Sequence, residues 1–166
     1  GLKRAASSKI QTSIIDPELF NSKEAFDREL ISIIDLYGAE LIILAGYMRI
    51  LTPFFVSHYF GKILNIHPSL LPKFPGLNTH QKAIDSSEKN HGLSIHFVTD
   101  KLDDGPIITQ ELVKIENSDT AKTLSVKVLK KEHIAYPKVI HWYTQRRLKL
   151  IDNITVTLDG KIICIK

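Results

Sequence analysis

The chain has 166 residues, 43% of them hydrophobic and 24% charged, which is typical of one folded domain and excludes a disordered or fibrous protein. Its apolar runs are far shorter than the roughly 20 residues that a membrane helix needs. The net charge of +4 is mild, and the one dense basic cluster, residues 145–149, lacks the interleaved aromatic residues of a nucleic-acid surface. We therefore expect small-molecule partners, with no membrane and no nucleic acid.

A single cysteine, Cys164, cannot form an internal disulfide, which suits a reducing compartment and predicts a cytoplasmic location. The sequence opens directly in a helical pattern at residues 1–6, without an initiator methionine or an apolar leader. We therefore expect the sequence to begin inside a helix.

The first predicted elements are a helix and two buried strands. A cap at Ser22 and an apolar stripe predict a helix that ends at Gly38. Residues 41–45 form a continuous apolar run and residues 62–66 (KILNI) a mainly apolar one, both typical of strands buried on both faces, and a short helix over 53–59 lies between them. This order predicts a parallel βαβ unit.

The middle of the chain begins with a long irregular, proline-containing stretch over residues 67–79. A helix is predicted over residues 80–87. Residues 93–98 and 107–113 predict two further strands, joined by an acidic loop over 99–106.

The last third is predicted to be a long helix and a hairpin. The helical pattern covers residues 120–148, and Pro137 is expected to kink or break it. Alternating residues over 154–165, centred on Asp159 and Gly160, predict a β-hairpin. The fold class is therefore α/β, with an open, mostly parallel twisted sheet, helices on both faces and a C-terminal β-hairpin.

Polar residues at the end of the second strand are candidates for catalysis, because ligands of open parallel sheets bind beyond the carboxyl ends of the strands. Asn65 and His67 bracket Ile66, so in an extended strand both side chains point to one face. An amide N–H beside an imidazole suits acyl transfer, because the amide can hold an oxyanion while the imidazole moves a proton. Taken alone, such a pair more often caps a loop.

A carboxylate of the acidic loop over 99–106 could pair with His67, raise its pKa and hold it protonated. Taken alone, the Asp-Asp-Gly-Pro turn at 103–106 is more often structural. The stiff, proline-rich loop after His67 favours a functional role, because a compact domain has no other need for such a long excursion.

Several stretches resemble the folate-dependent formyltransferases. Residues 65–72 (NIHPSLLP) and 92–105 (GLSIHFVTDKLDDG) are similar to the two signature motifs of that family. Residues 45–51 (AGYMRIL) and 74–80 (FPGLNTH) are similar to members that formylate 5-phosphoribosylglycinamide in de novo purine biosynthesis. The resemblance implies one formyltransferase domain over residues 1–166 with a Rossmann-like fold. It also implies that 10-formyltetrahydrofolate is the co-substrate and that the amine of 5-phosphoribosylglycinamide accepts the formyl group.

The resemblance also implies the site residues. It makes Asn65, His67 and Asp103 catalytic: Asn65 and protonated His67 would stabilise the oxyanion, and Asp103 would raise the pKa of His67 and assist proton transfer. Glu132 would bind the substrate ribose. No metal is implied, and family analogy makes a homodimer a possible assembly. Folate binding, largely through backbone groups, would involve Lys23, Met48, Arg49, Ile50, Leu51, Val98, Thr99 and Asp100.

The sequence departs from the family pattern in three places. Asn78 stands where relatives often have histidine, and Asp104 replaces a small residue. The family's first strand, glycine-rich phosphate loop, helix and second strand have no counterpart before Gly1, so we expect an N-terminally truncated domain.

His80 and His96 could shape the pocket or merely pack. The remaining histidines and neighbouring aromatic residues are expected to be structural: His58, His91, His141, Trp142 and Tyr143.

Three alternatives accompany this interpretation. A formyltetrahydrofolate deformylase shares the catalytic trio and uses water as acceptor, but residues 68–72 and 76–80 favour the transferase. A methionyl-tRNA formyltransferase is disfavoured, because it adds a C-terminal RNA-binding domain. A folate-binding remnant without turnover is the third, since losing a central strand would expose apolar edges.

Overall fold

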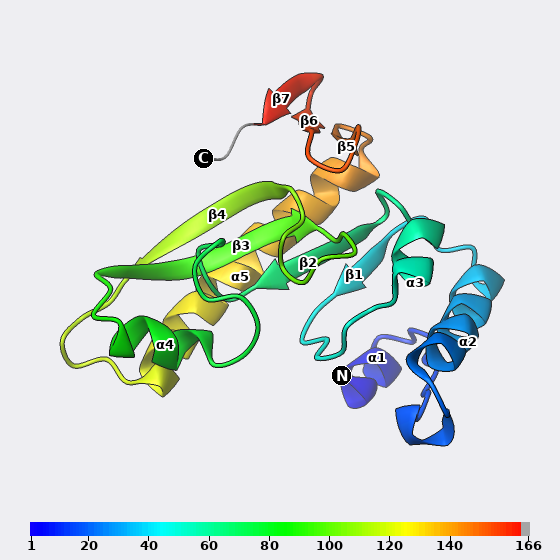
Figure 1. Cartoon of the computed structure of the whole chain (residues 1–166), viewed down its shortest axis with the longest axis horizontal. Coiled ribbons are helices and arrows are strands. Elements are labelled where there is room, and N and C mark those ends of the chain that lie inside the picture. Colours follow the sequence, from blue (N-terminus) through cyan, green and yellow to red (C-terminus); the bar gives the residue numbers. More distant parts are fainter. Residues whose placement is uncertain (164–166) are drawn as a thin grey trace. The chain divides into compact units, whose positions relative to one another are not determined.

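The structure is a computed structural model that describes residues 1–163 (Figure 1). Cys164 and Ile165, the last residue of the predicted hairpin, lie outside the described residues. The chain divides into two compact units, Gly1–Glu40 and Leu41–Lys166. The expectation of one domain over the whole chain stays a prediction.

The first unit is helical. Its elements are α1 (Leu2–Ser7), the 3-10 turn η1 (Pro17–Leu19) and α2 (Lys23–Leu36). α2 begins at the predicted cap, where the Ser22 hydroxyl accepts the Ala25 N–H at 3.0 Å. It ends before Gly38, whose φ of 60° suits glycine.

The second unit contains a mixed sheet with the strand order β1-β2-β3-β4. The strands are β1 (Ile42–Leu44), β2 (Ile63–His67), β3 (Asn90–Phe97) and β4 (Ile107–Lys114). β1 and β2 are parallel and flank α3 (Pro53–His58), which confirms the predicted βαβ unit. β3 runs antiparallel to both β2 and β4. The prediction of a mostly parallel sheet is therefore wrong for the described strands, because the short β3–β4 loop can join only antiparallel neighbours.

β1 differs from its prediction. It was expected to be buried on both faces, but Ile43 is 42% exposed. β1 is an edge strand of the described sheet and is bonded only to β2. The interior strand β2 fits the same expectation better, since its first residues, Ile63 and Leu64, are fully buried.

The core of this unit lies where α5 (Ala121–Thr144) packs along β3 and β4 (Figure 1). α5 contributes Leu124, Val128 and Val139, all of them without exposed surface. The Tyr136 hydroxyl lies 2.9 Å from the carbonyl oxygens of Leu44 and Leu64, so it donates to the backbone of β1 or β2. Burial raises the pKa of Tyr136, which keeps this donor protonated. The helix is thereby tied to the two parallel strands.

α5 continues through Pro137 and ends at Thr144, so a break at Pro137 and the predicted end near 148 are wrong, whereas the alternative of a kink stays a prediction. Buried residues on both sides of Pro137 hold the helix against the sheet, and proline removes only one helical N–H. None of the helices in residues 1–163 is long and apolar enough to cross a membrane.

The end of the chain forms a second, three-stranded sheet from β5 (Leu148–Leu150), β6 (Val156–Leu158) and β7 (Lys161–Ile163). The β6–β7 hairpin confirms the predicted hairpin, with positive φ at Asp159 (52°) and Gly160 (76°) in the turn. β5 was not predicted, because the basic residues before it continue the helical pattern. The expectation of helices on both faces of the main sheet stays a prediction.

Candidate functional site

β2 presents two polar side chains on one face near its carboxyl end. Asn65 and His67 alternate with Ile66, as predicted. In the antiparallel ladder Asn65 lies opposite His96 of β3, and His67 lies opposite Ser94. Two pairs of polar residues, Asn65 with His96 and His67 with Ser94, therefore lie opposite each other on β2 and β3.

Asp103, in the loop between β3 and β4, reaches both histidines. Its Oδ2 atom lies 3.4 Å from Nδ1 of His67, and its Oδ1 atom lies 3.9 Å from Nε2 of His96. Oδ2 also accepts the N–H of Gly76 at 2.8 Å. Asp103 has a φ of 50°, a left-handed conformation that Asp adopts more readily than most residues. The structure thus brings Asp103 and the two polar residues of β2 into one cluster, with His96 between them.

His67 has an acceptor at each ring nitrogen. Nε2 lies 2.9 Å from the Phe74 carbonyl oxygen, which can only accept, so Nε2 carries a proton. Nδ1 faces the Asp103 carboxylate. A second proton on Nδ1 would make the ring an imidazolium, which would pair with the Asp103 carboxylate at 3.4 Å.

The irregular segment over 68–78 is anchored to β3 and β4. The Ser94 hydroxyl donates to the Ser69 carbonyl at 2.7 Å and accepts the Leu71 N–H at 2.9 Å. The Gln110 amide donates to the Leu71 carbonyl at 2.9 Å. Because this segment leaves directly from β2, these buried contacts restrain the end of that strand.

A pocket opens beside the cluster, and Asn65, His96 and Asp103 line it. It encloses about 70 Å³, well below the roughly 300–1,000 Å³ of most ligand sites. A larger ligand would therefore extend beyond it, over the exposed lining residues Ile50 and Leu102. Six of the residues predicted to bind folate also line the pocket: Arg49, Ile50, Leu51, Val98, Thr99 and Asp100.

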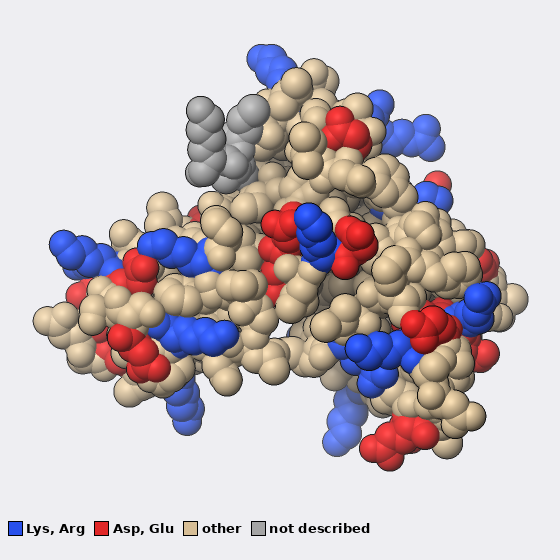
Figure 2. Space-filling view, in the orientation of Figure 1, with Lys and Arg blue, Asp and Glu red and all other residues tan. Residues whose placement is uncertain are grey.

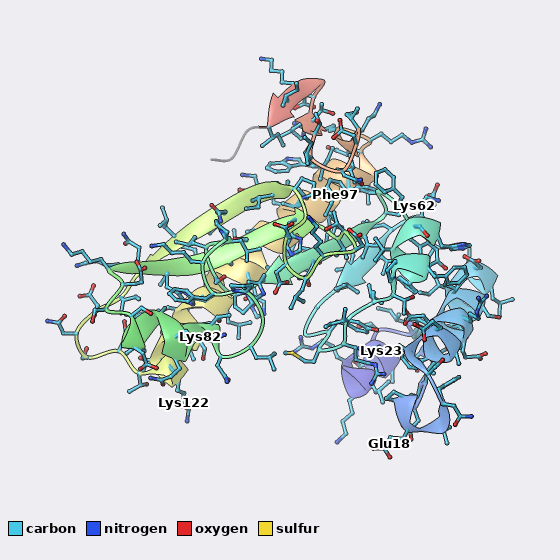
Figure 3. All side chains as sticks on the ribbon, viewed as in Figure 1. Glu18, Lys23, Lys62, Lys82, Phe97 and Lys122 are labelled. Atoms are coloured by element: carbon cyan, nitrogen blue, oxygen red, sulfur yellow. The ribbon has the colours of Figure 1, made fainter. Side chains whose placement is uncertain are left out.

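The other predicted site residues do not line this pocket. His67 lies behind Asp103 and is 5% exposed, whereas Met48 is 75% exposed. Lys23 begins α2 in the first unit (Figure 3), and its role stays a prediction. Glu132 lies on α5, where burial raises the pKa of its carboxyl group and the neighbouring His133 lowers it in part. Its role also stays a prediction.

The model of the formyl transferase family matches residues 1–140. The chain belongs to this family. It is 49% identical to the phosphoribosylglycinamide formyltransferase of Escherichia coli K12 over 161 residues, which cover 97% of this chain and 76% of that protein. A phosphoribosylglycinamide formyltransferase structure from Coxiella burnetii superposes with a TM-score of 0.93 at 49% identity, covering 98% of this chain and 76% of that one.

A formyltetrahydrofolate deformylase from Pseudomonas syringae is less similar. Its structure superposes with a TM-score of 0.84 at 26% identity and covers 95% of this chain but 52% of its own. The predicted formyltransferase resemblance is thus confirmed at the level of the family. In the part of the chain that the structure describes, no group of three or more His, Cys, Asp or Glu residues could hold a metal ion.

Sequence reasoning assigned no role to two residues that line the pocket, Leu44 and Tyr47. Tyr47 lies within residues 45–51, which resemble the formyl transferase family, whereas Leu44 lies in the predicted strand over residues 41–45. Acidic side chains surround a basic one over the β3–β4 loop (Figure 2). Here Asp104, a departure from the family pattern, pairs with Lys101 at 3.8 Å, and both side chains are exposed. Asn78, another departure, precedes α4 (Thr79–Asp85) with a φ of 61°, which asparagine tolerates.

His80, whose role the sequence left open, contacts the buried His91 at 3.0 Å between Nδ1 and Nε2. His91 also forms a hydrogen bond with the backbone carbonyl of Pro68. Because Pro68 directly follows His67, this bond supports the chain next to the catalytic candidate His67. Burial and, to a smaller extent, the charges of His80 and His67 lower the pKa of His91 to about 4, although the Pro68 bond opposes the shift. His80 thus acts through His91 in this structure and does not line the pocket.

The free energy of unfolding is expected to fall as the pH is lowered from 6.5 toward 4, because the unfolded chain protonates His91 at its ordinary pKa of 6.5 while the folded chain resists until about 4. Below that lower pKa, His91 should contribute no further loss. Urea unfolding across this pH range measures the effect. A His91→Phe variant keeps a ring at this position and removes the titrating group, so it should show a shallower decline. Equal slopes for the two proteins would contradict the prediction.

Proposed function

We propose that this chain transfers the formyl group of 10-formyltetrahydrofolate to the amine of 5-phosphoribosylglycinamide, a step of purine biosynthesis. The observation that carries the proposal is the cluster of Asn65, His67 and Asp103 at a pocket edge. It occurs in a chain that is 49% identical to a phosphoribosylglycinamide formyltransferase. The members of the family that carry this name support the choice of acceptor.

Asn65 would stabilise the transition state. Its amide lines the pocket and can donate an N–H to the formyl oxygen as that oxygen becomes negative. A protonated His67, held behind Asp103, would add a favourable electrostatic field. Both groups are in place before the reaction, so they need little reorganisation when the charge develops.

Asp103 would move the proton. The amine nitrogen forms a bond to the formyl carbon and must lose a proton, while the bond from that carbon to N10 of the folate breaks and N10 must gain one. The Asp103 carboxylate lines the pocket and can accept the first proton and return it to N10. The adjacent His67 offsets the negative charge of the carboxylate before and after this transfer.

The binding roles follow the resemblance. The residues of the β1–α3 and β3–β4 loops that line the pocket would hold the folate, with Ile50 and Leu102 against its apolar part. Lys23 would meet an anionic group of a ligand, and Glu132 would bind ribose hydroxyls. A cytoplasmic location and a homodimer remain predictions.

Hydrolysis of formyltetrahydrofolate is the second candidate, because a deformylase structure superposes on this chain with a TM-score of 0.84. The same three residues would then activate water in place of the amine. At 26% identity this relative is more distant than the formyltransferases at 49%.

An absorbance assay of folate turnover with and without 5-phosphoribosylglycinamide distinguishes the two functions. We expect turnover only when the amine is present, with formation of the N-formyl product. Turnover without the amine would support the hydrolase. Absence of turnover under both conditions would overturn both enzymatic proposals and favour a folate-binding protein without turnover, which isothermal titration with the folate would then detect.

A further inference from the structure

The Asn65 side chain has a partner that determines which way its amide faces. Nδ2 of Asn65 lies 3.1 Å from Nε2 of His96, the residue directly opposite it in the β2–β3 ladder. His96 is 2% exposed, so most of its ring is shielded from bulk water, although its edge lines the pocket. The sequence left the role of His96 open, and the mechanism described above does not use it.

The protonation of His96 follows from its second contact. Nδ1 of His96 lies 2.8 Å from the Phe97 carbonyl oxygen, and because a carbonyl only accepts, Nδ1 carries the proton. Burial lowers the pKa of His96, although the Phe97 bond and Asp103 oppose the shift, so the ring is neutral near pH 7. In a neutral imidazole the other nitrogen, Nε2, has a lone pair and accepts.

The lone pair on His96 Nε2 selects one orientation of the Asn65 amide. Nδ2 must face the ring, since a flipped amide would bring Oδ1 against the lone pair. Once Nδ2 is held there, its second N–H remains available to a ligand in the pocket. A flipped amide would instead place an acceptor at the same position and would repel a developing oxyanion.

The β3–β4 loop holds this arrangement in place. A Cβ atom added at Gly105 would lie 1.8 Å from the Phe97 carbonyl oxygen and 3.2 Å from Nδ1 of His96. The loop therefore passes directly over the hydrogen bond that sets the tautomer. The same loop carries Asp103, whose Oδ1 atom lies 3.9 Å from Nε2 of His96.

We propose that His96 is a positioning residue for formyl transfer: its Nε2 lone pair holds the amide nitrogen of Asn65 so that the second N–H of that nitrogen faces the formyl oxygen. This inference rests on the proposed function. His96 itself does not contact the reacting atoms and acts through Asn65.

A matched pair of variants tests the proposal in the full chain. In His96→Gln the side-chain oxygen can occupy the place of Nε2 and accept from Asn65, whereas in His96→Asn the amide reaches only the place of Nδ1. We expect kcat to fall about tenfold to a hundredfold in His96→Asn, since loss of one oriented donor costs up to about 10²–10³-fold. His96→Gln should retain kcat within about threefold, and KM should change little in both. Equal losses of kcat in the two variants would overturn the proposal.

A double-mutant cycle on kcat distinguishes positioning of Asn65 by His96 from a purely structural role of His96. Once Asn65 is replaced by alanine, His96→Asn should cause no further loss of kcat, because no amide remains to be oriented. If His96→Asn lowered kcat in the Asn65→Ala background by the same factor as in the unmodified chain, the proposal would be contradicted. Thermal unfolding of each variant provides the control for folding.

Nitrogen NMR tests the contact without turnover and so separates this inference from the proposed function. At neutral pH, His96 should be protonated at Nδ1 and unprotonated at Nε2. The side-chain N–H signals of Asn65, assigned from Asn65→Ala, should shift in His96→Asn and not in His96→Gln. A ring protonated at Nε2 would overturn the inference even if formyl transfer occurs. The expected tautomer together with absence of turnover would instead refute only the proposed function, and the orientation of Asn65 would stand.

Discussion

Replacement of His67 by alanine is expected to lower kcat for formyl transfer by about 10²–10⁴-fold, the usual contribution of a positioned acid or base. The structure gives the physical reason: Nδ1 of His67 lies 3.4 Å from the Asp103 carboxylate, next to the pocket, where a protonated ring would offset the negative charge. Without it, the carboxylate is an uncompensated, largely buried negative charge beside a developing oxyanion. Steady-state assays with a saturating amount of each substrate measure the change.

His141→Ala is the matched control for this substitution, because His141 is an exposed histidine of α5. Its kcat should stay near that of the unmodified chain. Asp103→Asn removes the charge but tolerates the φ of 50°, and it should also lower kcat by orders of magnitude. The combination with His67→Ala should cost little more than either change alone, since the two residues act as a pair. Full activity in His67→Ala, with an unchanged melting temperature, would contradict the assigned role.

Gly92→Ala is expected to lower the free energy of unfolding by about 3 kcal/mol or more, a large part of the stability of a domain of this size. A Cβ atom at this position would lie 2.0 Å from the Glu111 carbonyl oxygen of β4 and 2.9 Å from Cδ2 of Leu70. The backbone of β4 cannot yield as a flexible side chain could, so β3 and β4 would have to separate. Urea unfolding followed by the fluorescence of Trp142 measures the loss.

Gly160→Ala serves as the comparison for this stability measurement. An added Cβ atom there meets nothing within 4 Å, but the φ of 76° is costly for alanine. A loss of about 1–2 kcal/mol is expected from this strain alone. If Gly92→Ala destabilised the chain no more than Gly160→Ala, the steric argument would be wrong.

Local patterns predicted most elements of the fold. The cap at Ser22, the apolar stripe of α2 and the Asp159-Gly160 turn are signals between residues close in sequence, and the corresponding elements are present. Three predictions that depended on distant partners were wrong. The direction of β3 relative to β2, the exposure of Ile43 and the continuity of α5 through Pro137 all depend on which strand or core residues lie alongside.

In the candidate site, too, some features follow from local sequence patterns and others depend on partners far apart in the chain. Alternation in a strand was enough to place Asn65 and His67 on one face, because the side-chain period of an extended strand is two. The sequence also offered Asp103 as a partner for His67, through the acidic loop and the family resemblance. It contained no local signal for the contact between Asn65 and His96, which are 31 positions apart and meet only across the β2–β3 ladder.

The sequence by itself determined the α/β class, the family and the candidate catalytic trio, since each depends on short-range periodicity or on motifs of contiguous residues. Only the tertiary structure decided the mixed direction of the sheet, the residues that line the pocket and the partners of each histidine. These features arise from strand pairing and from loops that return to a distant strand. Their free energy comes from contacts between residues far apart in the chain, which no local pattern encodes.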